Sequence, residues 1–67
     1  MDVEALSYEL EEIIQENIER GSMFSIAKVP AIWEQTHPDI DFKKVFTKLF
    51  AEEKVSLADK THCEYHP

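Results

Sequence analysis

The sequence has 67 residues and a formal net charge of −7, with 43% hydrophobic and 31% charged residues. This size excludes a second domain and a large cofactor-binding sheet, so we expect one small folded domain over residues 1–67. The single cysteine excludes an internal disulfide, and no apolar run approaches the ~20 residues of a transmembrane helix. We therefore predict a cytoplasmic protein that does not cross a membrane. A core this small often gains stability from an oligomer, which keeps a homodimer open.

The negative charge lies in the first 19 residues. Seven acidic residues precede Arg20, the first basic residue, whereas residues 20–67 carry seven acids and seven bases and are neutral as a whole. The acidic pI therefore describes the first segment only. The rest of the domain can still present a basic face.

The first segment predicts a helix over residues 3–20. Its apolar side chains recur at helical spacing and form one stripe: Leu6, Leu10, Ile13, Ile14 and Ile18. Asp2 is a suitable N-cap, and Met1 and Leu6 occupy the positions of a hydrophobic staple. Gly21 is expected to end the helix in the left-handed conformation.

The other side of this helix is acidic. It collects Glu4, Glu11, Glu12, Gln15, Glu16 and Glu19. Glu12 and Glu16 form a like-charge pair one turn apart, and acids near the end of a helix oppose its dipole, so helix stability does not explain them. The face is either a solvated surface or a docking surface for a basic protein, with Glu12, Glu16 and Glu19 as the binding residues.

A second helix is predicted at about residues 28–36, after a short extended segment or helix approach at residues 23–26. Pro30 suits the first turn of a helix, and Pro38 pushes the residue before it out of the helical region. Trp33 lies on the apolar side and is expected in the core.

A third helix is predicted over residues 42–53, with Asp41 as its cap and Ile40 and Val45 as its staple. Its apolar face joins the others in an expected core of Leu10, Ile14, Trp33, Phe46, Leu49 and Phe50. The opposite face carries Lys43, Lys44, Thr47 and Lys48 and no acid. This face is either solvated or a phosphate-binding surface, and it lacks the arginine, asparagine and glutamine side chains that read bases.

A β-hairpin is predicted over residues 55–65. A three-residue loop at residues 59–61 pairs Leu57 with Cys63 and Val55 with Tyr65, which places the apolar residues on one face. The outer face then collects His62, Glu64 and His66 at a spacing that a metal could use, but a closed zinc site needs a fourth ligand from His37 or a second chain. We predict no metal and no cofactor.

The order of helix, extended segment, helix, tight turn, helix and two-stranded wing covers nearly the whole chain. It resembles the winged helix-turn-helix superfamily. This resemblance implies a mainly α fold, a three-helix winged-helix-like domain with a short C-terminal β-hairpin. It also implies nucleic-acid contacts by the third helix, at the positions of Lys43, Lys44, Thr47 and Lys48, and by the wing. Many small winged helices instead serve as protein-interaction modules.

No catalytic arrangement is evident, because neighbouring strand residues such as His62 and Cys63 point to opposite faces. We therefore predict a non-enzymatic protein. The favoured function is a small acidic regulatory adaptor or inhibitor that binds another protein through its first helix or an apolar patch. The alternative is a winged-helix nucleic-acid-binding transcriptional regulator that uses the third helix. A nucleic-acid mimic is a third hypothesis.

Overall fold

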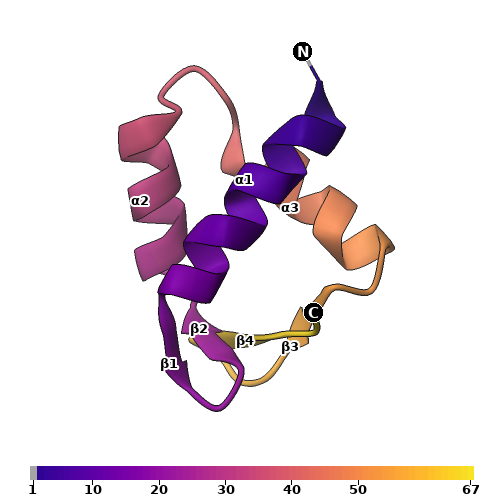
Figure 1. Ribbon diagram of the computed structural model, residues 1–67. Helices are drawn as coiled ribbons and strands as arrows, with labels where there is room; N and C mark the ends of the chain where they lie inside the picture. Colours follow the sequence, from indigo (N-terminus) through magenta and orange to yellow (C-terminus); the bar gives the residue numbers. More distant parts are fainter. Residues whose placement is uncertain (1) are drawn as a thin grey trace.

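The computed structural model describes residues 2–67, which fold into three helices and one four-stranded antiparallel sheet (Figure 1). The helices are α1 (Val3–Glu16), α2 (Lys28–Thr36) and α3 (Phe42–Ala51). The strands are β1 (Ile18–Arg20), β2 (Met23–Ser25), β3 (Val55–Leu57) and β4 (His62–Tyr65). The helices form one layer and the sheet lies below it in Figure 1. The chain is therefore a small α+β domain whose sheet is larger than the predicted hairpin.

Helix α1 begins as predicted, since an Asp2 carboxylate oxygen accepts hydrogen bonds from the backbone amides of Glu4 and Ala5. The proposed staple of Met1 and Leu6 includes a residue outside the described range. The predicted end at residue 20 is wrong, because α1 stops at Glu16.

The early end of α1 has a local cause and a tertiary one. The Asn17 side-chain amide donates to the Ile13 carbonyl oxygen at 2.8 Å, which caps the last turn. Ile18 then pairs with Phe24 in the sheet, where a β-branched residue packs well. Gly21 does adopt a left-handed conformation, with φ of 56°, but it serves the turn between β1 and β2 rather than the helix end.

The strands lie in the order β1-β2-β4-β3. The predicted hairpin register is confirmed, since Leu57 pairs with Cys63 and Val55 pairs with Tyr65. Strand β2 is the extended segment expected before the second helix, and its Phe24 pairs with Cys63 on the other side of β4. Strand β4 is thus central and connects the β3–β4 hairpin, which is the predicted wing, to the rest of the domain.

The second and third helices lie close to where the sequence predicts them. Helix α2 has the predicted bounds, with Pro30 in its first turn. Its N-cap, Ala27, supplies no side-chain hydrogen bond, but the Ser25 hydroxyl oxygen accepts from the amide of Lys28 at 3.0 Å. The Asp41 carboxylate caps α3. Helix α3 ends at Ala51, two residues before the predicted end, because Glu53 adopts a left-handed φ of 60°.

The core confirms four of the six predicted residues, since Leu10, Ile14, Trp33 and Leu49 are fully buried. The Trp33 indole N–H is satisfied by a 3.0 Å hydrogen bond to a backbone carbonyl oxygen in the α2–α3 turn.

Phe46 is only partly buried but packs against this core, whereas the prediction is wrong for Phe50, which is 37% exposed. Helix α3 directs Val45, which is fully buried, toward the core. Phe46 lies toward the sheet, edge-on to Phe24 at 6.2 Å between ring centroids. The spacing of apolar residues defines a broad stripe on the helix but does not show which part of the stripe is buried. In the fold, packing against α1 and the sheet buries one side of it.

Among residues 2–67, no helix combines the length and the apolar character that a membrane crossing requires.

Candidate functional site

The predicted acidic docking residues do not share one helix face. Glu12 and Glu16 are exposed on α1, whereas Glu19 lies on β1 because the helix ends early. There a Glu19 carboxylate oxygen is 3.2 Å from Nε2 of His62 on β4. Glu19 therefore contacts the wing instead of extending the acidic surface of α1.

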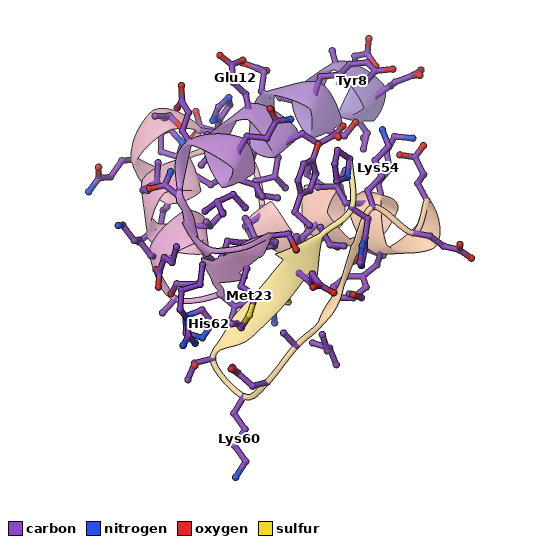
Figure 2. The ribbon with its side chains drawn as sticks, turned by 60° about the horizontal axis from the view of Figure 1, so that its bottom comes forward. Tyr8, Glu12, Met23, Lys54, Lys60 and His62 are labelled. Carbon is purple, nitrogen blue, oxygen red and sulfur yellow. The ribbon has the colours of Figure 1, made fainter. Side chains whose placement is uncertain are left out.

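Glu12 and Glu16 instead line a groove between α1 and α2, together with Glu9, Ile13, Thr36 and His37. The groove has a volume of about 270 Å³. Glu9, Glu12 and Glu16 follow one another at spacings of three and four residues, which places them on one side of the helix. Figure 2 shows Glu12 on the outer side of α1, pointing away from the sheet. We name this feature the acidic groove.

The α2 wall of the acidic groove is fixed by His37, which the sequence suggested as a helix boundary and a possible metal ligand. Its ring stacks on the buried Trp33 ring at 3.9 Å between centroids, nearly parallel to it. Its Nε2 is 3.4 Å from a Glu9 carboxylate oxygen, and its Nδ1 is 2.7 Å from the Thr36 hydroxyl. His37 directly follows the predicted helix and lies four residues after Trp33, and this spacing is the signal that could have placed the two rings together.

Glu11 does not lie on the exposed acidic face where the sequence placed it, since it is only 9% exposed. Its two carboxylate oxygens accept hydrogen bonds from the Tyr65 hydroxyl at 2.7 Å and from Nζ of Lys54 at 3.1 Å. The side-chain amide of Gln15 donates to the Tyr65 hydroxyl at 2.9 Å. This network joins α1 to the base of the predicted hairpin, through Lys54 just before it and Tyr65 at its end, and its role is structural.

The pKa values of the two donors follow from this contact. The hydrogen bond to Glu11 raises the pKa of Lys54 because it favours the charged ammonium. Burial raises the pKa of Tyr65, and the nearby Glu11 carboxylate raises it further. The ammonium of Lys54 also lies 5.5 Å from the centroid of the Tyr8 ring, and Figure 2 shows these two residues on the same side of the molecule.

The basic face of α3 is present but reduced. Lys43, Lys44 and Thr47 are exposed, whereas Nζ of Lys48 donates to a Glu52 carboxylate oxygen at 2.9 Å. This hydrogen bond raises the pKa of Lys48 and lowers that of Glu52. Two lysines of this helix are thus left for an external ligand.

The wing tip adds one further cation, Lys60, which extends away from the domain in Figure 2. Its neighbour Asp59 forms a tight turn in which its carboxylate accepts the backbone amides of Thr61 and His62, both at 2.8 Å. The amide of Thr61 is the main reason that the pKa of Asp59 is lowered. The tip therefore carries both signs of charge.

The three residues with a metal-like spacing do not converge. His62 faces Asp59 and Glu19, whereas Nε2 of His66 is 2.7 Å from the Ser56 hydroxyl and 3.9 Å from Glu64. Within residues 2–67, no three histidine, cysteine or acidic side chains are placed to hold one metal ion. Cys63 is fully buried, and this burial raises the pKa of its thiol, which disfavours the reactive thiolate.

No protein-family model matches this sequence, and no curated protein or solved structure is significantly similar to it. The functional argument therefore rests on the surfaces described above.

Proposed function

We propose that this protein is a small regulatory interaction module, an adaptor or an inhibitor, that binds a basic segment of another protein in the acidic groove. The observation that carries the proposal is the set of three carboxylates, Glu9, Glu12 and Glu16, along a groove whose lining includes the apolar Ile13. Such a surface suits a segment that places a lysine or arginine beside an apolar side chain.

Two of the three charges in the groove, those of Glu12 and Glu16, are available to a partner. Within residues 2–67, neither Glu12 nor Glu16 forms a salt bridge, and both are exposed. By contrast, Glu11 is already neutralised by Lys54 inside the domain. The net charge of −7 also increases the rate at which a basic partner meets this surface, most strongly at low salt.

A direct test uses a short synthetic peptide of alternating lysine and leucine as the probe. Isothermal titration calorimetry measures the affinity of the peptide. NMR chemical-shift mapping should place the peptide against Glu12, Glu16 and Ile13. The double variant Glu12→Gln and Glu16→Gln should weaken binding about 5- to 30-fold, which corresponds to roughly 1–2 kcal/mol for two exposed charge contacts. Its fold should be unchanged, because it removes a like-charge pair.

A matched control removes two charges outside the groove with Glu34→Gln and Glu53→Gln, both at exposed positions. This control should reduce affinity only through the change in net charge, and raising the salt concentration should remove that small effect. Equal weakening by the two double variants, or peptide shifts spread over the whole surface, would contradict the proposal.

Nucleic-acid binding by a winged-helix domain is a second candidate. It is supported by the element order, which keeps the predicted helices and wing and adds β1, and by the exposed Lys43 and Lys44 on α3. The pairing of Lys48 with Glu52 and the mixed charge of the wing tip weigh against it. We therefore favour the protein partner.

A further inference from the structure

His37 is the residue of the acidic groove whose charge can change near neutral pH. The other residues that line the groove are three glutamates, an isoleucine and a threonine. Histidine ordinarily gains or loses its charge between pH 5 and 8, whereas glutamate in general keeps its charge over most of this range. The His37 side chain is 16% exposed, so its ring can exchange protons with solvent. A single proton can therefore change the charge of the groove.

The polar contacts of His37 suit the neutral ring and the charged ring equally. Its Nδ1 is 2.7 Å from the Thr36 hydroxyl, which also lies 3.3 Å and 3.2 Å from the carbonyl oxygens of Ile32 and Trp33. When the ring is neutral, the Thr36 hydroxyl can donate to Nδ1 while Nε2–H donates to Glu9. When the ring is charged, Nδ1–H donates to the Thr36 oxygen, and the hydroxyl donates to one of the carbonyl oxygens instead. Protonation therefore requires no movement of the ring.

The position of the His37 ring is fixed by the core. The ring stacks on Trp33, which is fully buried, at 3.9 Å between centroids. Its backbone is also held, because its amide donates to the Trp33 carbonyl oxygen at 2.7 Å and its carbonyl oxygen accepts from the amide of Ile40 at 3.1 Å. A charge on His37 therefore appears at a defined place in the wall of the groove.

The charged groups that face His37 come from α1. Glu9, Glu12 and Glu16 line the groove with it, and Glu9 is within ion-pair distance of its ring. The α2 residue beside it, Thr36, does not titrate. Within residues 2–67, the groove lining includes no lysine, no arginine and no acid of the α2–α3 turn. The three glutamates give the groove a formal charge of −3, which a charged His37 reduces to −2.

We propose that His37 is the pH sensor of the acidic groove and that its protonation weakens the binding of a basic segment. This inference rests on the proposed function. The charged ring neutralises Glu9 and repels a lysine or arginine side chain that approaches Glu12 or Glu16. Because linkage is reciprocal, a basic segment that binds must also release protons from the ring. The protein would then bind its partner at neutral pH and release it in a mildly acidic environment.

The pH dependence of peptide binding tests the proposal. Isothermal titration calorimetry with the lysine–leucine peptide is carried out at pH 7.5 and pH 5.5 and at one ionic strength. The affinity should be about three- to fivefold lower at pH 5.5, which is the effect of one exposed charge contact. Lysine is charged at both pH values, so the difference does not come from the peptide.

Two variants assign the pH dependence to one histidine. His37→Phe keeps an aromatic ring over Trp33 and removes the titration, so its affinity for the peptide should be the same at both pH values. His66→Gln is the matched control, because His66 is exposed and lies outside the groove, and this variant should keep the full difference. Circular dichroism at both pH values should show that the two variants are folded.

Proton release provides a test on the unmodified chain. Calorimetry at pH 6.5 in two buffers of different ionisation enthalpy should show that binding releases roughly a third of a proton, as a fourfold difference in affinity requires. NMR at the same pH should show the ring signals of His37 moving toward the positions that they have at pH 8. The ring signals of His66 should not move. A purely structural role of His37 would produce no proton release.

Three results would overturn the proposal: equal affinities of the unmodified chain at pH 7.5 and pH 5.5, a pH difference that persists in His37→Phe, or binding at pH 6.5 without proton release. Each of these results still includes peptide binding, so each refutes the role of His37 and leaves the proposed function intact. A peptide that binds at neither pH would refute the proposed function itself, and this inference with it. The two failures are therefore distinguishable.

Discussion

Helices α1 and α3 have similar sequence patterns, but they have different neighbours in the fold. Each begins with an aspartate cap and each has one apolar stripe opposite one charged face. In α1 the charged face is divided, because Glu11 is buried against the wing while Glu12, the next residue, faces solvent. In α3 most of the charged face stays exposed and the apolar stripe is divided, with Leu49 buried and Phe50 37% exposed.

This comparison shows that helical periodicity defines an apolar and a charged face. It does not show how much of each face a neighbouring element covers. Adjacent positions on a helix point about 100° apart, so one side of a stripe can be covered while the other is open. The following experiments compare neighbouring residues on this basis, from the largest expected effect to the smallest.

The largest difference in unfolding free energy is expected between substitutions of Leu49 and of Phe50. Leu49→Ala removes a fully buried side chain and should cost about 2–5 kcal/mol of unfolding free energy. Phe50→Ala removes a larger but partly exposed ring, so we expect no more than about 1–2 kcal/mol. Urea denaturation followed by the fluorescence of Trp33 measures both. An equal or larger cost for Phe50 would mean that α3 is rotated relative to this structure.

Substitutions of the neighbouring acids Glu11 and Glu12 of α1 should also differ in their effect on stability. Glu11→Ala leaves Lys54 and Tyr65 without their shared acceptor and should cost about 1–3 kcal/mol. Glu12→Ala should change stability by no more than about 0.5 kcal/mol, because it removes an exposed charge with a like-charge neighbour at Glu16. The same denaturation experiment serves for both. Similar values for the two variants would show that Glu11 faces solvent in solution.

Alkaline pH should destabilise the contact between α1 and the wing. The pKa of Lys54 is raised in the fold, so its stabilisation is complete below the ordinary lysine pKa and disappears as the pH rises through the folded value. The pKa of Tyr65 is also raised, so ionisation of the unfolded chain lowers stability above about pH 10. Both effects have the same sign. Thermal melts between pH 8 and 11 should show a fall in midpoint that is smaller in a Lys54→Met, Tyr65→Phe double variant.

The smallest effect should come from the lysines of α3. If the chain binds duplex DNA, Lys43→Ala and Lys44→Ala should each lower the salt slope by about one, and Lys48→Ala by less because Glu52 already pairs with it. We expect the unmodified chain to bind no tighter than the ~10⁻⁴ to 10⁻⁶ M of nonspecific association at physiological salt. Fluorescence anisotropy with two unrelated duplexes measures this. A tight complex with one duplex only, lost on Lys44→Ala, would favour the second candidate function.

Local features of the chain were determined by the sequence itself. The caps at Asp2 and Asp41 and the start of α2 near Pro30 depend on residues within a few positions of one another, and the register of the 55–65 hairpin depends on two strands joined by a short loop. Hydrogen bonds and steric limits between residues close in sequence do not require a distant segment, so the sequence alone indicates them.

Only the tertiary structure decided the features that need distant partners. Strand β1 forms where a longer helix was predicted, because it joins through β2 a sheet whose other two strands come from the C-terminal hairpin. Glu11 is buried because Tyr65, which lies 54 residues further along, supplies its donor. The acidic groove likewise exists because α2 lies against one side of α1. Such contacts depend on which faces of the helices and the sheet pack together. The periodicity of one segment does not show which other segment packs against it.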